Sequence, residues 1–261
     1  MLMKKYKGYF IDLDGTIYAG SKRIPAAKRF IERLQSNGID FLFVTNNTTK
    51  MPEDVVKNLG DNHDIHVSVN NVYTAGLATA DYVKKDAESN QFDKTAYVVG
   101  EKGLITALQN NGFEITDNNP SYVIVGLDSS VNYDQLSKAV LLVRDGAKFI
   151  GTNPDSNIPT EKGMQPGAGS LVKLVEYATQ QKPVLIGKPE SIIMQNALDK
   201  IGLNKSDVVM VGDNYMTDIS AGINFGMDTL IVYTGLSTKE QVAQKEVQPT
   251  HQIDSLDDWE V

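Results

Sequence analysis

Cysteine is absent from this chain of 261 residues. Without a thiol, disulfide bridges, zinc sites built on cysteine and catalysis by a thiolate are all excluded. Long apolar runs are missing as well. The basic segment at the start of the sequence is followed by only three apolar residues before Asp12, which is too short for a signal peptide, and no stretch is long enough to cross a bilayer. We therefore expect a cytoplasmic protein.

Positive charge is also scarce, because 25 lysines and arginines stand against 33 aspartates and glutamates, a net charge of −8. This balance argues against nucleic acids and anionic membranes as partners. An acidic protein that handles an anionic substrate needs local positive charge from a metal, a lysine or a helix N-terminus. The rest of the composition, 41% hydrophobic and 22% charged, is that of a globular protein.

Strand-like and helix-like segments alternate along the chain. Apolar runs over 9–11 and 40–45 predict strands, and Pro25 opens a helical pattern over 25–36 between them. Further strands are expected at 72–74, 95–99, 122–125, 148–150, 183–186, 207–211 and 228–232. Further helices are expected at 52–59, 76–85, 104–110, 133–144 and 191–201. The alternation predicts an α/β fold, and Trp259 should anchor the C-terminal segment to its core.

The length of the chain favours two domains, or one domain with a large insertion. None of the strands expected in the middle of the sequence ends in a pair of carboxylates. We therefore expect a discontinuous domain over 1–79 and 178–261, with a separate α/β domain inserted over 80–177.

Polar side chains follow four of the expected strands. They are Asp12 and Asp14, then Thr45 and Asn46, then Lys188, then Asp213 and Asp218. Open α/β sheets bind their ligands at the carboxyl ends of the strands. Two ionised carboxylates this close repel each other, so the site should hold a cation, and oxygen ligands favour a hard one such as Mg²⁺. Each group alone also fits an ordinary turn after a strand, but together they supply a nucleophile, metal ligands, a hydroxyl donor and a cation.

The chain resembles the haloacid dehalogenase-like (HAD) superfamily over nearly its whole length. The four signatures, in the family's order, are Asp12-Leu-Asp14-Gly-Thr16, Thr45-Asn46, Lys188 and the segment from Gly212 to Asp218. Within the superfamily, the chain resembles the NagD-like, or p-nitrophenyl-phosphatase-like, branch. The motifs of that branch stand at Val44–Thr48, Gly151–Asp155, Pro166–Gly169, Gly187–Pro189 and Gly212–Asn214. The resemblance to this branch implies a Rossmann-like doubly wound parallel sheet, with an α/β cap domain inserted between the second and third signatures.

The resemblance also implies an activity, that of a Mg²⁺-dependent phosphatase acting on small phosphomonoesters through an aspartyl-phosphate. Asp12 is then the nucleophile, and Asp14 is the general acid that later acts as the base. The resemblance places Mg²⁺ on Asp12, on the backbone carbonyl of Asp14 and on Asp213. It implies Asp218 and Asn214 as residues that support the metal site or Lys188.

The resemblance assigns phosphoryl binding to the Thr45 hydroxyl, the backbone N–H of Asn46 and the Lys188 ammonium. In the cap, Asn153 and Asp155 are the candidates for contact with the substrate. The compatible substrates are sugar phosphates, nucleoside monophosphates, p-nitrophenyl phosphate and small phosphorylated acids. A homodimer formed through the cap is compatible with the resemblance alone.

Three alternatives remain open at this point. A phosphotransferase or phosphomutase of the same superfamily would carry the same signatures. A phospho-receiver domain also gathers aspartate, threonine and lysine on a parallel sheet, but it is about half this length and carries no cap. A non-catalytic phosphate-binding relative would be expected to lack one of the four signatures. Repeated Mg²⁺-dependent turnover of p-nitrophenyl phosphate separates an enzyme from the last two.

Overall fold

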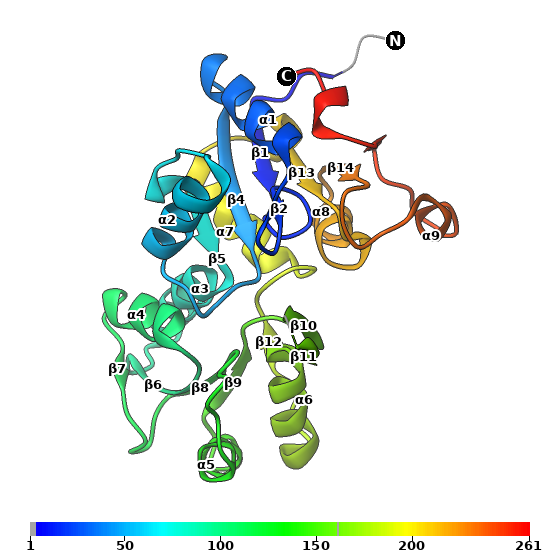
Figure 1. The fold of residues 1–261 in the computed structure, drawn as a ribbon. Coiled ribbons are helices and arrows are strands. Elements are labelled where there is room, and N and C mark those ends of the chain that lie inside the picture. The colour runs from blue at the N-terminus through cyan, green and yellow to red at the C-terminus, as the bar shows by residue number, and fades with distance from the viewer. Residues whose placement is uncertain (1–3, 161) are drawn as a thin grey trace. The chain divides into compact units, whose positions relative to one another are not determined.

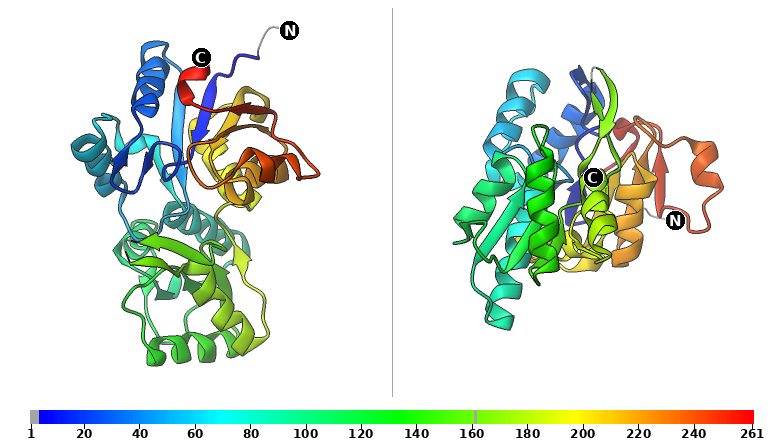
Figure 2. Two further views of the ribbon diagram at one scale, coloured as in Figure 1. Left: turned by 45° about the vertical axis from the view of Figure 1, so that its right-hand side comes forward. Right: turned by 90° about the horizontal axis from the view of Figure 1, so that it is seen from below.

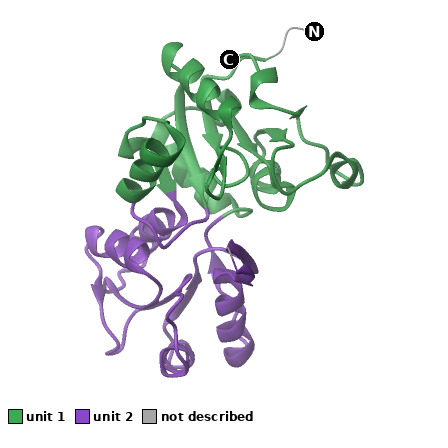
Figure 3. Ribbon diagram, in the orientation of Figure 1, with its two compact units in different colours: residues 1–45, 52–73, 188–261 green, residues 46–51, 74–187 purple. Residues whose placement is uncertain are grey.

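The computed structural model describes residues 4–160 and 162–261. The chain divides into two compact units, which Figure 3 shows in green and purple. Unit 1 contains residues 1–45, 52–73 and 188–261, and unit 2 contains residues 46–51 and 74–187. Each unit is built on its own sheet.

The described part of unit 1 is built on a six-stranded sheet in the order β15-β14-β13-β1-β4-β5 (Figure 1). Its strands are β1 (Gly8–Ile11), β4 (Asp40–Thr45), β5 (Val72–Thr74), β13 (Val208–Gly212), β14 (Asp228–Val232) and β15 (His251–Ile253). The pairings of β1 with β4 and β13, of β13 with β14, and of β14 with β15 are all parallel. The central strand β1 is buried along its whole length. A small antiparallel hairpin, β2 (Tyr18–Ala19) and β3 (Lys22–Arg23), follows β1 in the chain.

Helices cover the sheet of unit 1, as the views in Figure 2 show. They are α1 (Pro25–Ser36), α2 (Pro52–His63), α7 (Ser191–Ile201), α8 (Ser220–Phe225) and α9 (Lys239–Ala243), with a π-helical turn at Tyr215–Ile219 and short 3₁₀ turns at Val69–Asn71, Lys205–Asp207 and Leu256–Asp258. Alternate residues of a strand face opposite sides of a sheet. Tyr9 and Ile11 of β1 accordingly pack into one core cluster with Phe30 of α1, while Phe10 between them is buried but lies outside that cluster.

The C-terminal segment closes one side of this core. Trp259 is buried in the same cluster as Tyr9, and its indole N–H donates a hydrogen bond of 3.1 Å to the Tyr9 hydroxyl. Arg33 of α1 holds the segment with hydrogen bonds to the carbonyls of Leu256 and Trp259. The expectation that Trp259 anchors this segment is confirmed.

Unit 2 has a five-stranded parallel sheet in the order β12-β9-β8-β6-β7. Its strands are β6 (Thr95–Val99), β7 (Glu114–Ile115), β8 (Tyr122–Val125), β9 (Lys148–Gly151) and β12 (Val184–Leu185). Its helices are α3 (Ala75–Asn90), α4 (Lys102–Asn110), α5 (Tyr133–Arg144) and α6 (Ala168–Thr179). An antiparallel hairpin, β10 (Asn157–Thr160) and β11 (Gly163–Pro166), precedes α6. Residues of α5 and α6 share one apolar cluster with β6, β8 and β9.

Two parallel sheets with flanking helices confirm the predicted α/β class. The domain boundaries expected at residues 80 and 177 fall inside α3 and α6, whereas the chain passes from one compact unit to the other at 73/74 and 187/188. Unit 2 also includes residues 46–51 and the strand β12, which were both expected in the other domain. Across the described part of the chain, no helix is both long and apolar enough to cross a lipid bilayer.

Candidate active site

Asp12 lies directly after β1, the strand that has β13 on one side and β4 on the other. Its backbone N–H still donates to the carbonyl of Val211, with an N–O distance of 2.9 Å, so the ladder to β13 continues up to the carboxylate. Thr45, which ends β4 and is 8% exposed, and Asp213, which follows β13, therefore reach the same edge of the sheet. This edge is formed by the carboxyl ends of the parallel strands.

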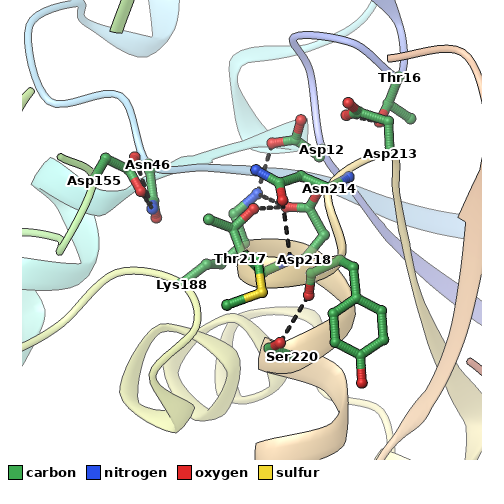
Figure 4. Close-up of polar contacts among 12 residues, drawn as sticks. Asp12, Thr16, Asn46, Asp155, Lys188, Asp213, Asn214, Thr217, Asp218 and Ser220 are labelled. Carbon is green, nitrogen blue, oxygen red and sulfur yellow. Dashed lines mark hydrogen bonds and ion pairs between the residues drawn. The ribbon is translucent and has the colours of Figure 1, made fainter. Parts of the chain in front are cut away.

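Lys188 joins two of the carboxylates at this edge (Figure 4). Its ammonium lies 2.6 Å from Asp12 Oδ1 and 2.7 Å from Asp218 Oδ1. The side chains of Lys188 and Asp218 are 2% and 1% exposed, and that of Asp12 is 13% exposed. Burial opposes the charged form of Lys188, but the charges of Asp12 and then Asp218 outweigh it and raise the pKa of the ammonium. Lys188 is therefore a permanent buried cation.

The carboxylate of Asp213 is held from two directions. The Thr16 hydroxyl donates to Oδ1 at 3.1 Å, as Figure 4 shows, and the backbone N–H of Leu236 donates to Oδ2 at 2.7 Å. Burial and then the negative charge of Asp218 raise the pKa of Asp213 to about 6, against the lowering effect of these two hydrogen bonds. Asp213 is therefore mostly ionised at neutral pH, but it takes up a proton at a higher pH than an ordinary aspartate does.

Asp12, Asp213 and Asp218 form a group whose carboxylate oxygens lie within 4.8 Å of one another. Three carboxylates face one ammonium, so the group carries excess negative charge. Burial, followed by the charge of Asp218, also raises the pKa of Asp12 well above its ordinary value. A hard divalent cation bound by oxygen atoms fits this donor set, because it would supply the missing positive charge and leave Asp12 ionised.

Asp218 is already engaged on both oxygens. Oδ1 accepts from Lys188, and Oδ2 accepts from the backbone N–H of Asn214 at 3.1 Å. Asn214 in turn accepts a hydrogen bond from the backbone N–H of Met216 and begins the π-helical turn that carries Asp218. Asp218 is thus held between Lys188 and the backbone of Asn214, and the predicted role of Asp218 and Asn214 in supporting the metal site or Lys188 stays a prediction.

The Asp14 side chain is exposed and stands apart from the three-carboxylate group. Its Oδ1 accepts the backbone N–H of Gly20 at 3.0 Å, across the turn of the β2–β3 hairpin. Gly15 makes the tight turn after it with φ of +92°, a conformation that side chains disfavour. Asp14 is thus held by the backbone and accessible to solvent.

The second signature crosses from one unit to the other, since Thr45 ends unit 1 and Asn46 begins the 46–51 segment of unit 2. The Asn46 amide nitrogen donates to both carboxylate oxygens of Asp155 at 3.1 Å, as Figure 4 shows. The Asn153 amide donates to the backbone carbonyl of Asn46 at 2.9 Å. Asn153 and Asp155 therefore hold the Asn46 segment, a role that sequence reasoning did not assign to them. Their predicted contact with substrate stays a prediction.

Sequence reasoning also missed the two donors to Asp213. Thr16 belongs to the first signature, but no role was derived for it. Leu236 acts through its backbone N–H, which no residue type reveals. A signal for Leu236 was nevertheless present, since Thr234-Gly235 follows the strand at 228–232 as another polar turn at a strand end.

Comparison with known families and proteins agrees with this geometry. The model for haloacid dehalogenase-like hydrolases matches residues 9–114, and a HAD-hydrolase-like model matches residues 185–259. The chain is 45% identical to the 5'-nucleotidase YutF of Bacillus subtilis, over 98% of each protein. It is 48% identical to an acid sugar phosphatase of Staphylococcus aureus, over 98% of this chain and 97% of that protein.

Solved structures give the same result. A double mutant of the thermostable NPPase from Geobacillus stearothermophilus has a TM-score of 0.91 and 47% identity, over 99% of each chain. NagD from E. coli K-12 has a TM-score of 0.92 and 33% identity, over 98% of each chain. The chain therefore belongs to the haloacid dehalogenase-like hydrolases, in their NagD-like branch, and is an enzyme of the phosphatase class.

Proposed function

We propose that this enzyme is a Mg²⁺-dependent phosphatase that hydrolyses small phosphomonoesters through an aspartyl-phosphate formed on Asp12. The observation that carries the proposal is the position of the Asp12 carboxylate. It follows the central strand of the sheet, contacts Lys188 at 2.6 Å and belongs to a group of three clustered carboxylates. This arrangement offers a nucleophile and the positive charge that an anionic phosphoryl group needs.

Asp12, Asp213 and the backbone carbonyl of Asp14 are the groups that would hold Mg²⁺. When bound, the cation supplies positive charge that reduces the repulsion between the carboxylate and the phosphoryl group. In this proposal Asp218 orients Lys188, whose ammonium donates to its Oδ1 at 2.7 Å.

In the first step, a carboxylate oxygen of Asp12 attacks phosphorus and the bond from phosphorus to the ester oxygen breaks. Protonated Asp14 gives its proton to that oxygen, and the alcohol leaves. In the second step, Asp14 accepts a proton from water while the water oxygen attacks phosphorus. The bond between phosphorus and Asp12 breaks, which releases inorganic phosphate and restores the carboxylate.

The phosphoryl oxygens are bound by three donors in this proposal. Lys188 contributes a buried point charge, Thr45 a hydroxyl, and Asn46 the backbone N–H of the peptide that follows Thr45 directly. Unit 2, which contains Asn153 and Asp155, serves as the cap. The names of the relatives, a 5'-nucleotidase and an acid sugar phosphatase, support nucleoside monophosphates and sugar phosphates as the substrate classes to test first.

The proposal is tested by phosphate release from a panel of sugar phosphates, nucleoside monophosphates and p-nitrophenyl phosphate, with Mg²⁺ and with EDTA. We expect multiple turnovers with Mg²⁺ and none with EDTA. Asp14→Ala should lower kcat by about 10²-fold to 10⁴-fold, because it removes the general acid and base. Release that persists in EDTA would contradict the metal requirement. No release from any ester by a folded protein would favour transfer or binding instead.

Asp155→Ala tests the contact between the Gly151–Asp155 loop and Asn46. The change removes the two carboxylate oxygens that accept from the Asn46 amide, so the segment that presents the Asn46 N–H loses one of the side chains that hold it. A lost hydrogen bond to a charged group is worth about 1.5 to 3 kcal/mol, so the KM for p-nitrophenyl phosphate should rise by about tenfold or more.

Inhibition by inorganic phosphate, which has no leaving group, shows whether Asp155 positions Asn46 or contacts the leaving group of the substrate. If Asp155 positions Asn46, the inhibition constant of phosphate rises together with KM. If Asp155 instead contacts the leaving group, the phosphate constant stays unchanged. Asp117→Ala is the matched control, since the Asp117 side chain in unit 2 is 70% exposed and pairs only loosely, at 3.6 Å, with Lys138.

A further inference from the structure

The segment Thr234–Ser237 follows β14 and belongs to none of the four signatures, yet it is bonded to the carboxylate proposed to hold the metal. The Leu236 N–H donates to Asp213 Oδ2 at 2.7 Å. The Ser237 N–H donates to the backbone carbonyl of Asp213 at 3.2 Å. The Ser237 hydroxyl accepts the N–H of Tyr215 at 2.8 Å, which ties the segment to the residues after Asp213.

The same segment reaches the loop that carries the nucleophile. The Thr234 hydroxyl donates to the backbone carbonyl of Gly15 at 2.7 Å. Thr16, the next residue of that loop, donates to Asp213 Oδ1 at 3.1 Å. The Asp12–Thr16 loop, Asp213 and the Thr234–Ser237 segment therefore form one hydrogen-bonded unit.

Steric contact adds to the hydrogen bonds. A Cβ atom at Gly235 would lie 2.0 Å from Asp213 Oδ2, far inside the contact distance. Only a glycine lets the backbone approach the carboxylate closely enough for the next N–H to donate to it. The Leu236 side chain itself is 69% exposed, so the contribution of Leu236 comes from its backbone.

From these contacts we infer that Thr234–Ser237 is a positioning element for divalent-cation binding, a role that deepens the proposed function and rests on it. The segment fixes the Asp213 carboxylate against rotation and holds it at a constant distance from the nucleophile loop. Each oxygen of Asp213 accepts one hydrogen bond from the protein and retains a lone pair for the cation. Backbone and hydroxyl donors of this kind orient metal ligands, and their loss weakens metal binding by about 10-fold to 100-fold.

The test compares Leu236→Pro with Leu236→Ala, because proline removes the backbone N–H and alanine keeps it. Mg²⁺ binding is measured by calorimetry without substrate, so that the readout does not depend on turnover. We expect Leu236→Pro to bind Mg²⁺ about 10-fold to 100-fold more weakly than the wild type. Leu236→Ala should bind within about twofold of the wild type, since it removes only exposed side-chain atoms.

Two further variants keep the inference testable if the proline variant does not fold. Thr234→Val removes only the hydroxyl that binds Gly15. Gly235→Ala places a methyl group against the Asp213 carboxylate, and it should also weaken Mg²⁺ binding by about tenfold or more. Gly60→Ala is its control, because a Cβ at Gly60 would meet its nearest neighbour at an ordinary 3.6 Å.

The outcomes separate this inference from the proposed function. Wild-type affinity for Mg²⁺ in folded Leu236→Pro and Gly235→Ala would overturn the positioning role and leave the phosphatase proposal standing. Failure of the wild-type protein to bind Mg²⁺ would overturn the metal requirement of the proposed function and this inference with it. Weaker binding in these variants, with Leu236→Ala and Gly60→Ala unchanged, would support the positioning role.

Discussion

Replacing Asp12 by asparagine is expected to abolish turnover, with a fall in kcat of at least about 10³-fold, as when other covalent nucleophiles are removed. The asparagine side chain can still accept the hydrogen bond from Lys188 through its carbonyl oxygen. However, an amide is not a nucleophile toward phosphorus, so no aspartyl-phosphate can form. The measurement is phosphate release under single-turnover and multiple-turnover conditions with Mg²⁺.

The control for this change is Asp40→Asn, which alters an exposed aspartate at the start of β4, the opposite end of that strand from Thr45. Its activity should match that of the wild type. If Asp12→Asn kept substantial activity, the aspartyl-phosphate mechanism would be removed and direct attack by water would replace it.

Asp12→Asn also has an expected effect on stability, with a sign set by electrostatics. Burial and then the charge of Asp218 raise the pKa of Asp12 in the folded, metal-free protein. The folded state therefore binds this proton more tightly than the unfolded state does, and stability falls as pH rises above the ordinary range of a carboxyl group. Asparagine removes that penalty. In EDTA at neutral pH, the Tm of the variant should be no lower than that of the wild type.

Replacing Lys188 by alanine is expected to lower activity by at least about 10²-fold, the size of the loss seen when one preorganised electrostatic group is removed. The Lys188 side chain is 2% exposed, and its ammonium lies within 2.7 Å of both Asp12 and Asp218. Without it, a phosphoryl group approaches Asp12 and Asp218 with one positive charge fewer to offset the repulsion. Both kcat and KM for p-nitrophenyl phosphate should be measured, since a charge that contacts the phosphoryl group affects both.

Lys188→Ala should also lower the stability of the protein, and this effect needs a control separate from the loss of activity. Removing one partner of a buried ion pair leaves uncompensated charge and costs about 3 to 5 kcal/mol of stability. Adding Asp218→Asn to Lys188→Ala should restore part of that stability without restoring activity. Lys148→Ala is the matched single variant, because Lys148 pairs with Asp86 at 2.6 Å but is 33% exposed and lies outside the predicted site. A mild effect of Lys188→Ala on activity would mean that Lys188 is structural.

Local patterns were enough to predict most of the secondary structure. The strand at 40–45 and the helices at 25–36 and 191–201 have the bounds expected from their apolar patterns and their start and stop residues. The hairpins β2–β3 and β10–β11 were not expected. Their strands are short and mostly exposed, so they lack the apolar alternation that identifies a strand.

Some features of the candidate site could likewise be predicted from the sequence, and others could not. Three of the four polar strand ends could be placed from the sequence, because parallel strands of one sheet bring their carboxyl ends to one edge whatever their order. Lys188 follows β12, which pairs with β9 in the sheet of unit 2, so this rule does not place it. The order β13-β1-β4, which places Asp213 and Thr45 on either side of Asp12, depends on how the strands pair. The contact between Lys188 and both Asp12 and Asp218 depends on the same packing.

The sequence by itself determined the fold class, the family and the residues that carry the proposed chemistry, because each depends on residue type and local spacing. Only the tertiary structure decided how those residues are held. Asn46 is bound by Asp155, 109 residues away, and Asp213 is bound by the backbone N–H of Leu236. A contact between distant segments has no local pattern, and a backbone N–H is the same in every residue except proline. Such contacts therefore emerge only once the chain has folded.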